Sequence, residues 1–211
     1  MAKVKEGARL QLSGKADGLV YVQFNGGVYT RKLPKRKKEA WTPGMLLNEQ
    51  RFKRVNAFCS LFKDSVIPQI WNGLSERMSG YALFIKTNKS AFATDGSIPD
   101  AKKIRLSIGN LSFPEGLEAK RSAKDENRIE VKWPKQMHVG GVHLFDELMV
   151  ISGVDGQYSD ITPTGIARND LGGTFSLPID PIPQAPGPMP LYLFFASRDH
   201  RDYSESVCFE V

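Results

Sequence analysis

Residues 191–197 read LYLFFAS, an almost unbroken apolar run that ends in a small polar residue. Alternate side chains of a strand point to opposite faces, so Leu191, Leu193 and Phe195 share one face and the intervening residues share the other. Both sets are apolar. Residues 144–151 read LFDELMVI and repeat this two-sided pattern. The two stretches therefore predict strands that are covered on both faces.

A strand of a two-sheet domain meets the core through one face only, so the second face of two adjacent strands of this kind forms a large apolar patch. We expect this patch to be an interface made by Phe145, Met149, Ile151, Leu191, Leu193 and Phe195. Its first candidate cover is the helical segment 43–88 of the same chain. A second protomer or an unknown protein partner is the alternative.

The rest of the C-terminal half has the pattern of an all-β domain, because short apolar runs alternate with turn residues at regular spacing. We predict strands at 104–108, 116–122, 128–133, 143–152, 161–168, 173–177, 190–197 and 205–211. Eight short strands favour a sandwich.

Three segments resemble a fibronectin type III module: 128–133 (RIEVKW), 192–197 (YLFFAS) and 204–207 (SESV). In that fold an early strand ends in a core tryptophan, matched by Trp133. A late strand carries a tyrosine and, four positions on, a small residue. The resemblance implies an immunoglobulin or fibronectin III-like sandwich over 101–211, with a departure at the proline-rich connector before the tyrosine strand.

The N-terminal half mixes a small sheet with helices. Residues 19–24 and 28–33 flank a glycine turn and predict a hairpin, to which 9–12 adds a third strand. Helices are expected at 43–63, after Thr42-Pro43, and at 75–88. The expected fold class is α+β: a small N-terminal β-hairpin plus helices (1–100) packed against a C-terminal all-β sandwich (101–211).

A second resemblance spans the chain. Residues 13–15 (SGK), the glycine hairpin, residues 50–52 (QRF), residues 106–111 (LSIGNL) and the C-terminal Tyr and Ser strands are similar to a family of uncharacterised proteins of anaerobic gut bacteria. That family has no established activity, so the resemblance supports a domain organisation and leaves the function open.

Charge is unevenly distributed. Residues 1–100 hold 17 Lys and Arg against 8 Asp and Glu, whereas residues 101–211 hold 12 against 15. The densest run is 31–38, between Tyr29 and Trp41, and its basic members are Arg31, Lys32, Lys35, Arg36, Lys37 and Lys38. Such a run contacts nucleic acid phosphates, docks onto an acidic surface or is simply solvated, and the sequence leaves these alternatives open.

No pattern of residues predicts catalysis, a metal or a cofactor. The three histidines, His138, His143 and His200, lack the spacing of zinc sites. Cys59 and Cys208 fit buried free thiols, and no apolar run is long enough for a signal peptide or a membrane span.

We therefore expect a cytoplasmic, non-enzymatic structural or binding module that contacts a protein partner or its own copies and no membrane. A nucleic-acid-associated protein acting through 31–38 is the alternative.

Overall fold

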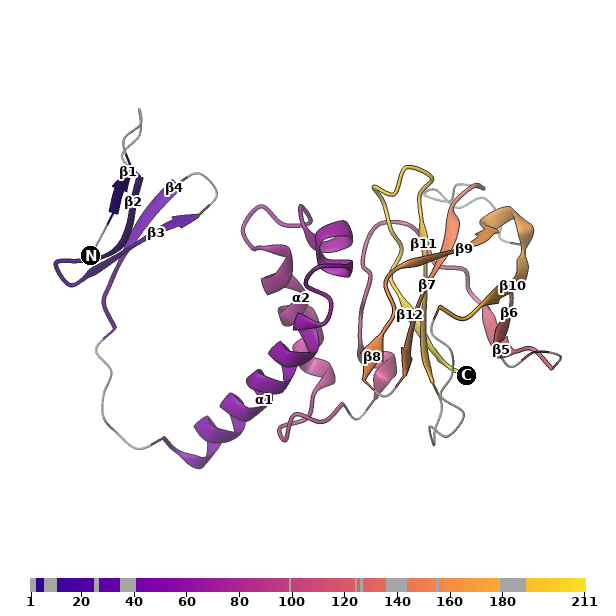
Figure 1. Ribbon diagram of the computed structural model, residues 1–211, viewed down its shortest axis with the longest axis horizontal. Coiled ribbons are helices and arrows are strands. Elements are labelled where there is room, and N and C mark those ends of the chain that lie inside the picture. Colours follow the sequence, from indigo (N-terminus) through magenta and orange to yellow (C-terminus); the bar gives the residue numbers. More distant parts are fainter. Residues whose placement is uncertain are drawn as a thin grey trace. The chain divides into compact units, whose positions relative to one another are not determined.

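The computed structural model describes residues 3–5, 11–24, 27–34, 41–98, 100–123, 125, 127–135, 144–154, 156–178 and 189–211. Across these residues the chain is α+β, with three antiparallel sheets and few helices. It divides into two compact units (Figure 1), unit 1 from Met1 to Met45 and unit 2 from Leu46 to Val211.

Unit 1 is an antiparallel sheet of four strands in sequence order: β1 (Lys3–Lys5), β2 (Gln11–Ala16), β3 (Leu19–Phe24) and β4 (Gly27–Lys32). The predicted hairpin is confirmed as β3 and β4. The third strand, expected at 9–12, instead runs to Ala16, because Asp17 and Gly18 both adopt positive φ (51° and 73°) and make the tight turn. Neither this Asp-Gly turn nor β1 was predicted from the sequence.

Two α-helices follow β4 in the chain. Helix α1 (Pro43–Ser60) begins at the predicted Thr42-Pro43 signal, since the Met45 N–H donates to the Thr42 carbonyl oxygen at 2.9 Å. Helix α2 (Gly80–Asn88) begins five residues later than predicted, because the Ser79 hydroxyl caps it by accepting the Ala82 N–H. Shorter helical turns are η1 (Ile67–Trp71), η2 (Lys89–Ala91), η3 (Ala101–Lys103) and η4 (Arg168–Asp170).

Two further sheets complete unit 2. One has the order β10-β6-β5, and the other has the order β12-β11-β7-β8, with β9 also paired to β7. The strands are β5 (Glu118–Arg121), β6 (Arg128–Lys132), β7 (Glu147–Val154), β8 (Gln157–Tyr158), β9 (Thr162–Ala167), β10 (Gly172–Ser176), β11 (Pro190–Ala196) and β12 (Val207–Glu210).

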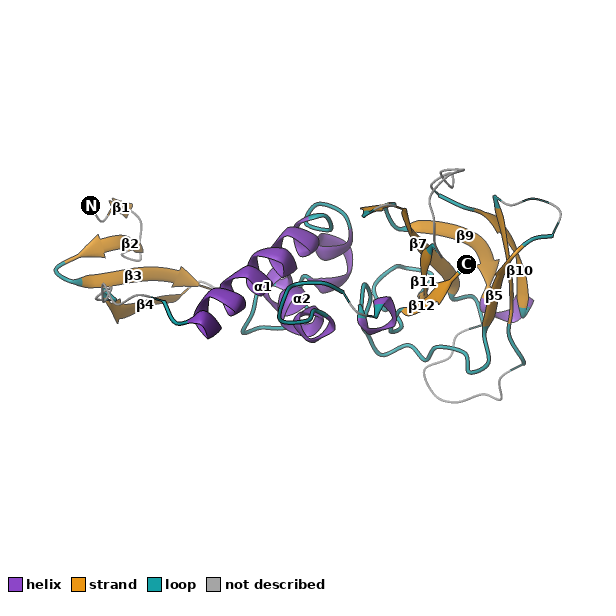
Figure 2. Ribbon diagram, turned by 90° about the horizontal axis from the view of Figure 1, so that it is seen from below, coloured by secondary structure: helices purple, strands orange, loops and turns teal. Residues whose placement is uncertain are grey.

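Unit 2 has three layers, seen from the side in Figure 1 and by secondary structure in Figure 2. The helices pack on one face of the sheet that contains β7 and β11, and the shared apolar residues form the core under the helices. The β10-β6-β5 sheet packs on the other face, and the shared apolar residues form the core between the two sheets. The expected boundary at 100/101 is therefore wrong: the helical segment shares a core with the strands, and the chain divides at Met45/Leu46.

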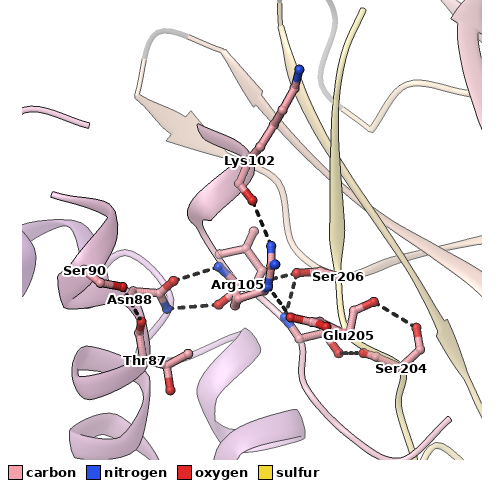
Figure 3. Close-up of polar contacts among 10 residues, drawn as sticks. Thr87, Asn88, Ser90, Lys102, Arg105, Ser204, Glu205 and Ser206 are labelled. Atoms are coloured by element: carbon pink, nitrogen blue, oxygen red, sulfur yellow. Dashed lines mark hydrogen bonds and ion pairs between the residues drawn. The ribbon is translucent and has the colours of Figure 1, made fainter. Parts of the chain in front are cut away.

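The strand predicted at 104–108 does not form. The Leu106 and Ser107 N–H groups donate to the Ser206 hydroxyl oxygen at 2.9 and 3.2 Å, and the Ser206 N–H donates to the Ser107 carbonyl oxygen at 3.0 Å. On its other side this segment is held by buried Asn88, whose amide accepts the Arg105 N–H and donates to the Arg105 carbonyl oxygen at 2.7 and 2.9 Å (Figure 3). Side chains thus replace the ladder of a strand and tie α2 to the sheets.

Candidate functional site

The six residues expected to form one apolar interface are divided by the structure. Met149 and Ile151 of β7 belong to the core under the helices. Leu191, Leu193 and Phe195 of β11 belong instead to the core between the two sheets. Our assignment to a single face was wrong, because it combined odd positions of both strands, whereas the observed register pairs odd with even positions.

That register pairs Tyr192 with Ile151 and Phe194 with Met149. Cross-strand partners share a face, so these residues make up the helix-facing side. Phe145 lies before β7 and is 65% exposed, outside either core. The second apolar face does exist, and as expected the helical segment covers it.

A charged pair is buried beside the inter-sheet core. The Arg168 Nε lies 3.3 Å from the Asp146 Oδ2, with the two side chains 4% and 1% exposed. The guanidinium also donates to the Ser112 carbonyl oxygen at 2.8 Å and lies 4.1 Å from the centre of the Phe195 ring. Burial lowers the pKa of Arg168, and the Asp146 carboxylate opposes this shift. The Arg168 carbonyl oxygen accepts the Trp133 indole N–H at 3.1 Å, so this pair anchors η4 to the core.

The two cysteines lie in the core under the helices, as expected for structural thiols. Burial raises the pKa of Cys59 to about 12 and that of Cys208 to about 11. The neutral thiol is therefore the stable form in the folded protein.

We expect neither thiol to react with iodoacetamide in the native protein at about pH 8, and both to react once urea unfolds the chain. Their raised pKa values also mean that the unfolding free energy is unaffected below the ordinary thiol pKa of 9.0 and falls above it, because only the unfolded thiols ionise there. Mass spectrometry after alkylation gives the readout. Rapid native labelling of Cys59 would contradict its placement in the core.

A cavity of about 260 Å³ lies on the β10-β6-β5 sheet, lined by Glu118, Lys120, Glu130, Val131, Lys132, Gly173 and Thr174. Its charges balance, and Lys132 pairs with Glu118 at 3.0 Å. The cavity therefore favours neither an anion nor a cation.

Other chemistry is sparse in the described ranges. No cluster of three or more His, Cys, Asp or Glu residues there could hold a metal, and no helix there has the length and apolarity of a membrane span. His200 lies in a turn with a φ of 55°, whereas His138 and His143 fall outside the described residues.

The basicity of the protein belongs to unit 1. Residues 1–45 contain ten Lys and Arg against three Asp and Glu, a net charge of +7, whereas the other 166 residues contain 19 against 20, a net charge of −1. Of the six basic residues singled out in the sequence, Arg31 and Lys32 lie exposed on β4. Lys35, Arg36, Lys37 and Lys38 fall outside the described residues. Unit 1 is thus a small sheet with a strong positive charge.

The pairing of the unit 1 strands separates its side chains into two faces. Val20 pairs with Lys15 on β2 and with Arg31 on β4, and Val22 pairs with Tyr29. We call the surface made by these five residues the Tyr29 face. Tyr21, Thr30 and Lys32 lie on the opposite face. The neighbouring cations Arg31 and Lys32 therefore point to different sides of the sheet, which was not predicted from the sequence.

The side chains described for unit 1 do not form a buried core. None of residues 13–23, 28–34 and 41–45 is buried, and Tyr29 is 51% exposed. A small sheet whose described side chains are all at least partly exposed is marginal by itself. A bound partner that buried these side chains would stabilise the unit 1 sheet.

A second exposed apolar group lies on the first turns of α1. Leu46, Leu47 and Phe52 are each about half exposed, and the helix has no buried residue before Val55. Exposed large apolar side chains on this part of α1 are available for contact with a protein partner.

Comparison with protein-family models, with curated proteins and with solved structures finds no match to this chain. The architecture described above is an α+β chain in which unit 1, with its four-stranded sheet and positive charge, precedes the three-layer unit 2.

Proposed function

We propose that the protein is a non-enzymatic binding module in which unit 2 is a rigid scaffold and unit 1 binds a polyanionic partner. One observation carries this proposal: residues 1–45 hold a net charge of +7, and none of the side chains described for residues 13–23, 28–34 and 41–45 is buried. A concentrated positive charge attracts polyanions over the Debye length and releases their counterions on contact.

The β part of the scaffold is, in this proposal, an immunoglobulin or fibronectin III-like sandwich. Its strand orders support this: β5, β6 and β10 take the places of strands A, B and E, and β7, β11 and β12 those of C, F and G, with β9 beside β7. Trp133 follows β6 and packs edge-on against Phe195 with 5.5 Å between ring centres, as a core tryptophan would. Membership of the gut-bacterial family stays part of the proposal.

The buried free thiols fit a reducing compartment, so a cytoplasmic location is also proposed. Contact with a protein partner or a second protomer is the second candidate function. It is favoured by exposed Leu46, Leu47 and Phe52 on α1.

The polyanion proposal is tested by elution of the full chain from a heparin column. We expect elution well above physiological salt, and clearly earlier elution for a variant with Lys35, Arg36, Lys37 and Lys38 changed to Ser. The matched control removes four exposed lysines of unit 2, Lys63, Lys86, Lys89 and Lys103. Both variants lose the same charge, so equal shifts would show a non-specific charge effect and overturn the proposal.

A further inference from the structure

We propose that the Tyr29 face of unit 1 binds single-stranded nucleic acid, with Tyr29 stacking on a base and Lys15 and Arg31 contacting phosphates. This inference rests on the proposed function, because it names the class of polyanion. It also assigns different roles to the two faces of the sheet, although both carry a cation and a tyrosine.

The arrangement on this face is the first argument. Lys15, Val20 and Arg31 form one cross-strand row, and Val22 and Tyr29 form the next. Strands lie about 4.8 Å apart, so the backbones of Lys15 and Arg31 are separated by roughly 10 Å, with valine between them. Tyr29 lies two residues before Arg31 on β4 and therefore on the same side. An exposed aromatic ring thus shares a partly apolar sheet face with two cations.

Single strands match this surface better than duplexes do. Proteins that hold single strands combine a positive track for the backbone with aromatic side chains on which unpaired bases stack. Bases inside a duplex are already stacked on each other and cannot occupy Tyr29 in this way. The apolar contact therefore adds to affinity only when the bases are free.

Charge also distinguishes between the molecules that could bind the Tyr29 face. A second copy would bring two units of +7 together, and their repulsion opposes a sheet-to-sheet dimer. An acidic polypeptide would satisfy Lys15 and Arg31 but offers a flat group for Tyr29 only where it carries an aromatic residue, whereas every nucleotide carries a base. A single-stranded nucleic acid satisfies both requirements.

The test is fluorescence anisotropy of a labelled oligothymidine of about 20 nucleotides with the full chain, at low and at physiological salt. We expect Tyr29→Ala to weaken binding by about 5- to 150-fold, the range measured for loss of one stacked base. Tyr29→Phe retains the ring and should bind as the wild type does. Tyr29→Ile removes the ring but favours a strand, so its loss of binding cannot be ascribed to unfolding.

Two matched controls come from the opposite face. Tyr21→Ala removes the same side chain from the same sheet, and we expect less than about a twofold change, well below the stacking range. Arg31→Ser should weaken binding and lower the salt dependence by about one counterion, whereas Lys32→Ser, with the same loss of charge, should have a smaller effect.

Three results would overturn the inference: equal effects of Tyr29→Ala and Tyr21→Ala, equal or tighter binding of a duplex of the same length, or equal competition by polyglutamate. If heparin retention depends on unit 1 but the oligonucleotide does not bind, the polyanion proposal survives and this inference fails. If heparin retention is also absent, both fail.

Discussion

Replacing Trp71 by Ala is expected to lower the free energy of unfolding by about 3–5 kcal/mol, the range for loss of a large buried aromatic ring. Trp71 is fully buried, its ring centre lies 4.8 Å from that of Phe84, and its indole N–H donates to the Leu106 carbonyl oxygen at 2.9 Å. The change therefore leaves a cavity and a buried carbonyl group without its donor. Urea denaturation followed by circular dichroism measures the effect.

Two further tryptophan variants make this prediction specific. Trp71→Phe retains a six-membered aromatic ring but loses the hydrogen bond and the rest of the indole, so we expect a smaller cost of about 1–3 kcal/mol. Trp41 is 53% exposed, and Trp41→Ala should change stability by less than about 0.5 kcal/mol.

The shared core predicts that helices and sheets unfold together. We therefore expect hydrogen exchange of α2 and β11 to accelerate in parallel in Trp71→Phe. Acceleration in α2 alone would contradict the single unit that we infer for residues 46–211.

Asp146→Asn is expected to destabilise the protein by about 3–5 kcal/mol, because it leaves the buried Arg168 guanidinium without its opposite charge. The amide is nearly the same size as the carboxylate, so the loss is electrostatic. Equilibrium unfolding in urea gives the difference.

The control for this change is a surface ion pair of similar chemistry. Glu118 and Lys132 are 3.0 Å apart with both side chains 66% exposed, and Glu118→Gln should cost no more than about 1 kcal/mol. Changing Asp146 to Leu together with Arg168 to Met should restore part of the stability lost in Asp146→Leu alone, since no unpaired charge remains. If Asp146→Asn costs no more than Glu118→Gln, the buried pair is not a structural anchor.

The sequence predicts those elements of the fold that depend on residues close together in the chain, and it predicts poorly those that depend on contacts between distant residues. Local signals were reliable: Thr42-Pro43 marked the start of α1, and short runs of apolar and β-forming residues marked β6, β7, β10 and β11. The start of α2 was misplaced, because Met78 continues the apolar spacing of Tyr81 and Ile85, whereas the helix is capped at Ser79. Residues 104–108 have a strand pattern, but their backbone partners are side chains distant in sequence, Asn88 and Ser206.

The candidate site shows the same limit. The sequence identified the basic run and its neighbouring Tyr29, but composition cannot show which cations share a face with that ring. The pairing of β3 with β4 decides this, and it places Arg31 with Tyr29 and Lys32 with Tyr21.

The α+β class, the apolar strands covered on two faces and the concentration of positive charge near the N-terminus could all be predicted from residue patterns. These properties follow from side-chain periodicity and charge, which are local. Only the tertiary structure decided that Tyr192 and Phe194 rather than Leu191 and Leu193 meet the helices, that the chain divides at residue 45, and that Asp146 pairs with Arg168. Each of these depends on strand register or on contacts between distant residues, and a shift of one residue in register would exchange the two faces of a strand.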